Sequence, residues 1–291
     1  MKKIITIIAL SLTILLVATG CELFKRDKME NIEIITSIYP IEYVTERLYG
    51  ESSNVKSIYP KGSDISKYKL TKKQIKDFSS NDLFVYNGTT NEREYATSML
   101  NQNKNLKIID AAYGIESTYS SHDVWLNPSN VLMIAQNIRN ELFEYITNPY
   151  LVSEINEQYD LLKIDITELE TEYKKTADNS INKSIISYDE SLKFLEKYGF
   201  TVINLTEEGK SKDNNVIKAQ ELLKGKKLNY VFVTELNEDD GIIDDLLNNY
   251  GAKKLTFRVL ETINEEDLVK NNDYLSIMHN NIEQIKIETY K

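Results

Sequence analysis

A long apolar repeat in the middle of the chain constrains the fold more than any other feature. Between residues 152 and 173, apolar or aromatic side chains recur at alternating intervals of three and four residues. This spacing places them on one face of an α-helix, with charged residues on the other faces. A helix of about thirty residues, at roughly 1.5 Å per residue, can reach from one lobe to another. We therefore predict a linking helix over residues 149–178. A coiled-coil dimerisation helix is the alternative, although only about three heptads are present.

Strand-like and helix-like segments alternate on both sides of this repeat. The strand-like segments are short apolar runs at residues 32–37, 54–59, 82–86, 106–110, 183–188, 201–205, 230–234 and 254–257. The segments with helical spacing or helix signals are residues 39–49, 72–78, 130–145, 190–198, 214–223, 239–250 and 274–286. Such alternation indicates an α/β fold with mostly parallel sheets. The sequence therefore predicts two Rossmann-like α/β lobes, over residues 32–148 and 179–291, joined by the long helix.

The N-terminus has the features of a bacterial lipoprotein signal. Two lysines precede an apolar run over residues 4–18, and the small pair Thr19-Gly20 precedes Cys21. The run is short for a membrane span, so residues 1–20 are predicted to be a signal peptide. Cys21, the only cysteine, is the predicted lipidation site, with an incidental cysteine as the alternative. Residues 21–31 then form a tether, and acyl chains hold the body on the outer side of the cell membrane.

Composition excludes several classes of function. The chain has 45 acidic and 35 basic residues and a formal net charge of −10, which argues against nucleic-acid binding. One Cys and two His leave no set for a multi-cysteine metal site or for a Ser-His-Asp or Cys-His nucleophile. A phosphate-binding loop of the Walker type is also missing from the sequence. We therefore expect a binding protein rather than an enzyme.

Five segments resemble one known family, in the same order along the chain. They are Ser37-Ile38-Tyr39-Pro40, the run DLFVYNG at 82–88, VWLNP at 124–128, KYGF at 197–200, and YLSIM at 274–278 followed by Asn280-Asn281. Together they resemble the metal-binding lipoproteins of ABC importers for zinc and manganese. The resemblance implies a cleft between the two lobes that holds one transition metal as cargo. In that family the ligands are typically three His and one carboxylate.

The resemblance assigns the ligand positions one by one. The first His position, after Pro60-Lys61-Gly62, falls on Ser66, and the second, just before the VWLNP segment, falls on Asp123. The third falls on Tyr188. The carboxylate position falls on Thr234, with Glu235 next to it.

Every His position is thus substituted, and oxygen ligands remain. Asp123 and Glu235 are the best remaining metal ligands, and carboxylate and hydroxyl oxygens suit a hard cation. A cleft lined by Ser66, Tyr188 and Thr234 equally suits a small polar organic molecule. Three further acids, Asp64, Asp189 and Glu190, lie nearby in the sequence. Lys67 and Lys69 could form salt bridges with these acids, and His122 could replace a missing imidazole. We expect His279 on the surface and Trp125 in the core.

The resemblance implies a membrane-anchored, extracytoplasmic solute-binding protein of an ABC importer. It implies a monomer that carries one zinc or manganese ion to a permease and its ATPase. The alternative is a divergent member of the family that binds a non-metal solute or acts as a surface interaction lipoprotein. Fold alone does not decide between these functions.

Overall fold

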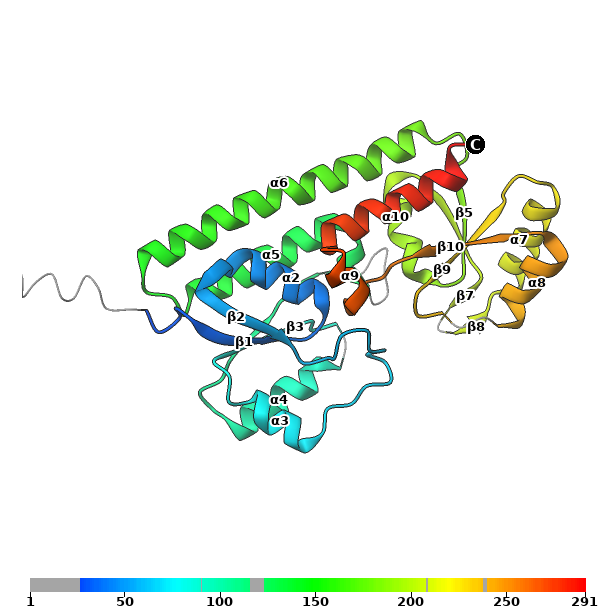
Figure 1. Ribbon diagram of the computed structural model, residues 1–291. Helices are drawn as coiled ribbons and strands as arrows, with labels where there is room; N and C mark the ends of the chain where they lie inside the picture. The colour runs from blue at the N-terminus through cyan, green and yellow to red at the C-terminus, as the bar shows by residue number, and fades with distance from the viewer. Residues whose placement is uncertain (1–26, 90, 116–122, 208, 238–239) are drawn as a thin grey trace, which may run out of the picture.

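The computed structural model shows two α/β lobes and one long helix that runs along both (Figure 1). The structure describes residues 27–89, 91–115, 123–207, 209–237 and 240–291. The predicted signal peptide, Cys21 and His122 lie outside these ranges. Within the described ranges, no helix combines the length and apolar character needed to cross a bilayer. The predicted fold class, α/β with parallel sheets in two lobes, is confirmed.

The first lobe is built on a four-stranded parallel sheet in the order β2-β1-β3-β4. The strands are β1 (Ile32–Thr36), β2 (Ser53–Ser57), β3 (Leu83–Tyr86) and β4 (Lys107–Asp110). All four residues of β3 are buried, as expected for a central strand of a parallel sheet. The helices of this lobe are α2 (Tyr39–Tyr49), α3 (Lys72–Phe78), α4 (Glu92–Gln102) and α5 (Pro128–Phe143). Thr71 caps α3 in a capping box with Gln74.

The second lobe repeats this topology. Its sheet has the order β10-β9-β5-β6, so its first strand again lies between its second and third. The strands are β5 (Ser184–Ser187), β6 (Thr201–Asn204), β9 (Tyr230–Thr234) and β10 (Lys253–Phe257). The helices are η3 (Glu190–Tyr198), α7 (Asp213–Lys224), α8 (Gly241–Tyr250), α9 (Glu265–Val269) and α10 (Tyr274–Thr289). In such sheets, ligands bind beyond the carboxyl ends of the strands.

The long helix α6 (Pro149–Asn179) occupies the stretch with the apolar repeat. It packs against α2 and α5 of the first lobe and against α10 of the second, and Figure 1 shows α6 in green beside α10 in red. Ile155, Leu162 and Ile166 are fully buried in this packing. The apolar stripe is therefore used within the chain, which removes the basis for a coiled-coil dimer. One continuous core extends from the first lobe along α6 and α10 to the second sheet.

Three local features differ from the sequence-based expectation. The segment Glu190–Tyr198 is a 3-10 helix rather than an α-helix. Asp189 caps its start, and Gly199, with a φ of 94°, ends it. Helix α4 was not expected, because its buried residues are few and its first one, Glu92, is charged. The two-residue strands β7 (Thr206–Glu207) and β8 (Lys210–Ser211) and the five-residue α9 are too short for a periodic signal.

Candidate functional site

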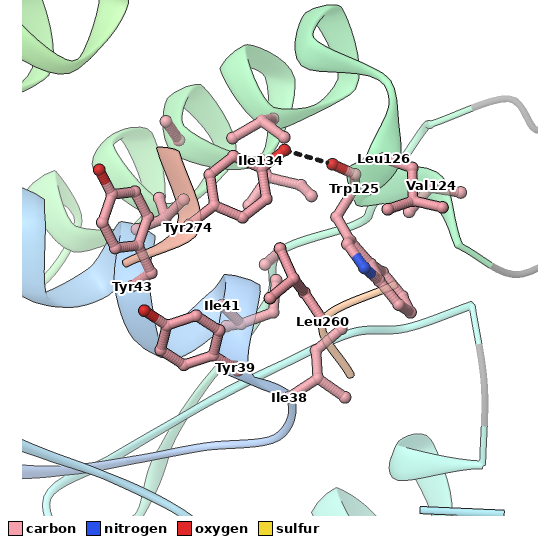
Figure 2. Close-up of a cluster of buried hydrophobic side chains, with 14 of the residues drawn as sticks. Ile38, Tyr39, Ile41, Tyr43, Val124, Trp125, Leu126, Ile134, Leu260 and Tyr274 are labelled. Atoms are coloured by element: carbon pink, nitrogen blue, oxygen red, sulfur yellow. Dashed lines mark hydrogen bonds between the residues drawn. The ribbon is translucent and has the colours of Figure 1, made fainter. Parts of the chain in front are cut away.

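A segment after β10 crosses from the second lobe to the first, and we call residues 258–263 the interlobe strap. The indole Nε1 of Trp125 donates to the Val259 carbonyl at 2.6 Å. The Tyr274 hydroxyl donates to the Trp125 carbonyl at 2.6 Å, as the dashed line in Figure 2 shows. The backbone N–H of Tyr39 donates to the carbonyl of Glu261 at 3.0 Å. Trp125 is 1% exposed, so the predicted core role is confirmed, and the strap, which continues from β10 of the second lobe, is fixed to the first lobe.

Asp123 lies where the two lobes meet. It precedes the short 3-10 helix η2 (Val124–Leu126) of the first lobe, and its Oδ2 accepts a hydrogen bond from Ser191 Oγ of η3 at 3.1 Å. Burial, with a smaller contribution from the charges of Asp189 and Glu235, raises the pKa of Asp123 to about 7, against the lowering effect of the Ser191 hydrogen bond. The charge of Glu235 thus acts on Asp123, while the assignment of these two residues as a ligand pair stays a prediction.

Glu261 of the strap is a second buried carboxylate in this region. Its Oε2 is buried and has no hydrogen-bond partner among the residues that the structure describes. Burial, together with the charges of Asp123, Asp64 and Glu235, raises its pKa to about 8. The charges that most affect Glu261 are thus all negative. A buried carboxylate in such surroundings is stabilised by a cation or by a proton.

Glu92, at the start of α4, is a third such carboxylate. It is 1% exposed, and neither of its carboxylate oxygens has a hydrogen bond of normal geometry in the described structure. Burial raises its pKa to about 7, while the nearby Tyr59 hydroxyl lowers it. Its charge in turn raises the pKa of Glu261. We refer to Asp123, Glu261 and Glu92 as the interlobe carboxylates.

Glu235, at the carboxyl end of β9, is bound differently. Its Oε1 and Oε2 accept the Val259 N–H at 3.0 and 2.9 Å, and Oε1 also accepts the Leu260 N–H at 3.1 Å. The guanidinium Nε of Arg258 lies 3.3 Å from the same oxygen. Both carboxylate oxygens are therefore already paired with protein donors. The assignment of Glu235 as a metal ligand stays a prediction, and this geometry weighs against it.

The three other predicted cleft residues are occupied by local hydrogen bonds. The exposed Ser66 donates its hydroxyl to Asp64 Oδ1 at 2.5 Å. The Tyr188 hydroxyl donates to Asp240 Oδ2 at 2.6 Å, and its pKa is raised to about 12 by burial and by that bond. Thr234 is 4% exposed, and its hydroxyl oxygen lies 3.3 Å from the Leu236 N–H. Their role as ligands stays untested, but none of these hydroxyls joins the interlobe carboxylates.

The remaining candidates also have their own partners. His279 is about half exposed and its Nδ1 lies 2.6 Å from Glu172 of α6, so it is a surface residue that ties α10 to α6. Lys67 pairs with Asp64 at 3.1 Å. Asp189 caps η3 and accepts from Asn237 at 2.9 Å. Glu190 lies 3.7 Å from Lys193.

Metal ligation in this arrangement rests on few side chains. Within the described ranges, no group of three or more His, Cys, Asp or Glu side chains is placed to hold a metal ion together. An ion bound among the described residues would therefore have two carboxylates at most as protein acids, with water or solute as its other ligands. Glu261, Glu92 and Ser191 were not among the residues predicted from the sequence. Glu261 follows β10 at the carboxyl end of the sheet, which is the one signal that could have found it.

Comparisons with known proteins identify the family. Residues 34–287 match the family described as "ZnuA: Zinc-uptake complex component A periplasmic". The zinc-binding lipoprotein AdcA of Streptococcus pneumoniae is 23% identical over 314 residues, covering 99% of this chain and 61% of AdcA. The high-affinity zinc uptake system protein ZnuA of Bacillus subtilis is 21% identical, covering 89% of this chain and 88% of that protein. The chain thus spans less than two thirds of the AdcA relatives it matches.

Solved structures share the fold. The Zn(II)-bound ZnuA-like domain of Streptococcus pneumoniae AdcA superposes with a TM-score of 0.74 at 20% identity, covering 90% of this chain and all of that domain. The metal-dependent lipoprotein YcdH of Bacillus subtilis gives a TM-score of 0.76 with the same identity and the same coverage. The matched family consists of uptake components, in agreement with the expectation of a binding protein rather than an enzyme. From the match over residues 34–287, the chain belongs to the ZnuA family of zinc-uptake complex components.

Proposed function

We propose that this chain is the extracytoplasmic binding protein of an ABC importer and that it captures one divalent metal ion. Its family and the names of its relatives, zinc-binding lipoprotein and zinc uptake system protein, support uptake of a metal. The signal at residues 1–20 and Cys21 supports a lipid anchor on the outer face of the cell membrane. A monomer would pass the ion to a membrane permease that an ATPase drives.

One observation carries the proposal: Asp123 and Glu261 are buried next to other carboxylates. The charges that most affect both of them are negative, and Glu261 Oε2 has no hydrogen-bond partner within the described structure. Two such carboxylates repel each other unless a proton or a cation lies between them. A divalent ion removes this repulsion and replaces the missing partner. We therefore assign Asp123 and Glu261 as the metal ligands, with Glu261 in place of Glu235.

The ligand set indicates which ions the site would prefer. Carboxylate oxygens and water suit hard cations, which are commonly held by one or two carboxylates and several waters. Zinc also accepts carboxylate oxygens, at about 2.0–2.2 Å, but a site without imidazole loses the ligands that favour zinc over harder ions. We expect one-to-one binding of zinc or manganese, with a smaller preference for zinc than a site built from three His would have.

A non-metal solute is the second candidate function. The described residues hold no group of three metal-ligating side chains, and the hydroxyls of Tyr188 and Ser66 already serve neighbouring carboxylates. A polar solute with an amine would also neutralise Asp123 and Glu261. The same family scaffold would then carry a different cargo or serve as a surface interaction protein.

The test is a titration of the mature chain, residues 22–291, after removal of metal with a chelator. Zn²⁺, Mn²⁺ and Ca²⁺ are added in turn, and heat of binding and bound metal per chain are measured. We expect one ion per chain and at least about tenfold weaker binding in Asp123→Asn and Glu261→Gln. Glu207→Gln is the matched control, because Glu207 is exposed and pairs with Lys212 at 2.9 Å away from these carboxylates. Absence of stoichiometric binding for all three ions would favour the non-metal candidate.

A further inference from the structure

We propose that Glu235 is a positioning residue whose carboxylate holds the interlobe strap in the conformation that presents Glu261 to Asp123. The role of Glu261 as a ligand rests on the proposed function. The hold of Glu235 on the strap rests on geometry alone. Glu235 is therefore assigned to the shape of the site and is not counted among its ligands.

The contact between Glu235 and the strap is a backbone contact. Two consecutive peptide N–H groups, those of Val259 and Leu260, point to the one carboxylate at 2.9 to 3.1 Å. A carboxylate that accepts two backbone donors forms charge-assisted hydrogen bonds, which are stronger than neutral ones. Two N–H groups aimed at one anion fix the peptide planes of residues 259 and 260, and therefore the direction in which the chain enters Glu261.

The backbone of Leu260 has an unfavourable conformation that needs stabilising contacts. Its φ is 64°, in the left-handed region that glycine adopts readily and leucine rarely. Its side chain is fully buried beside Ile38 and Trp125, as Figure 2 shows, so the residue cannot relax by turning outward. A buried, non-glycine residue with a positive φ persists only where its neighbours fix it. The carboxylate of Glu235 is the acceptor for its N–H.

The rest of the strap is fixed by other groups, which isolates the part played by Glu235. The Arg258 N–H donates to Asn281 Oδ1, and the Arg258 carbonyl accepts from Asn281 Nδ2, both at 2.8 Å. The Arg258 guanidinium also contacts Asp267, with its Nη2 2.8 Å from Oδ2. Asp267 therefore touches the side chain of Arg258 but none of the strap amides that Glu235 holds. This difference makes Asp267 a matched control.

The experiment is amide hydrogen exchange of the full mature chain without metal, followed by mass spectrometry on the peptides that cover the strap. The variants are Glu235→Ala, Glu235→Gln and Asp267→Asn. We expect exchange across residues 258–261 to rise at least about tenfold in Glu235→Ala and by less in Glu235→Gln, whose amide oxygen still accepts one hydrogen bond. Asp267→Asn is expected to keep the wild-type rate at Val259 and Leu260. Peptides from β1 and β3 report whether a variant has lost its overall fold.

Metal titration of the same variants separates this proposal from the proposed function. Loss of affinity in Glu235→Ala, together with faster strap exchange and partial recovery in Glu235→Gln, supports positioning. Loss of affinity with an unchanged strap would make Glu235 a direct ligand and overturn positioning. Unchanged exchange in both Glu235 variants would also overturn it. If the wild-type chain binds no metal, the proposed function fails, while strap exchange in Glu235→Ala still decides whether Glu235 holds the strap.

Discussion

Ser191 of the second lobe donates its hydroxyl hydrogen bond to Asp123 of the first lobe, with 3.1 Å between Oγ and Oδ2. This bond stabilises the charged form of Asp123 and so lowers its pKa, against the larger effect of burial. In Ser191→Ala we expect the pKa of Asp123 to rise above its value of about 7. Metal affinity at pH 7 should then fall, by about threefold to tenfold, because a larger fraction of Asp123 is protonated. Binding calorimetry at pH 7 and at pH 8.5 measures this, and equal losses at both values would contradict it.

The stability of the metal-free protein should depend on pH through Glu261. Its pKa is about 8 in the folded chain against an ordinary 4.5, so the folded state binds the extra proton. This contribution is complete below pH 4.5 and is lost as pH rises through about 8. Urea unfolding at several pH values should show Glu261→Gln gaining stability relative to wild type as pH rises. A constant difference between the two proteins from pH 5 to pH 9 would show that Glu261 is not buried as described.

The bond between Tyr274 and Trp125 should contribute measurably to the junction of the lobes. Removing the hydroxyl in Tyr274→Phe leaves the buried Trp125 carbonyl without that donor. We expect a loss of about 1–3 kcal/mol in the free energy of unfolding. Tyr290→Phe is the control, because Tyr290 is 37% exposed and should change stability by less than about 0.5 kcal/mol. Similar values for the two variants in urea unfolding would contradict the assignment.

Helix α6 offers a control on its own surface. Ile166 is fully buried against the core, whereas Ile164, two residues earlier, is 56% exposed. Ile166→Ala should cost about 2–5 kcal/mol in the free energy of unfolding, and Ile164→Ala should cost less than about 0.5 kcal/mol. Both variants should stay monomeric in sedimentation experiments if the apolar stripe packs within the chain. A dimer that Ile166→Ala dissociates would revive the coiled-coil alternative.

The fold could be predicted well from the sequence because its signals are periodic and local. The repeat from residue 152 to 173 predicts α6, and the apolar runs predict all eight strands of the two sheets. Glycines at 199 and 251 end helices at positive φ, as their positions indicate. Helix α4 was missed because its first buried residue is the charged Glu92, which hides the apolar pattern.

The site was predicted less well, because its chemistry depends on contacts between distant segments. Asp123 does contact the second lobe, through Ser191, whereas its pairing with Glu235 as a metal ligand stays a prediction. The hydrogen bonds of Glu235 to residues 259 and 260 depend on the path of the strap after β10, which no local pattern reports. Glu261 was missed for the same reason, since its burial arises from the junction of both lobes.

The most direct test of the central claim is the position of the metal. Crystals of the mature chain grown with Mn²⁺ or Zn²⁺ would be measured at the absorption edge of the metal, and an anomalous difference map calculated. We expect one peak between Asp123 and Glu261, at about 2.0–2.2 Å from a carboxylate oxygen of each for zinc. A peak on Glu235 with Glu261 turned away, or no peak between the lobes at a saturating concentration of metal, would contradict it.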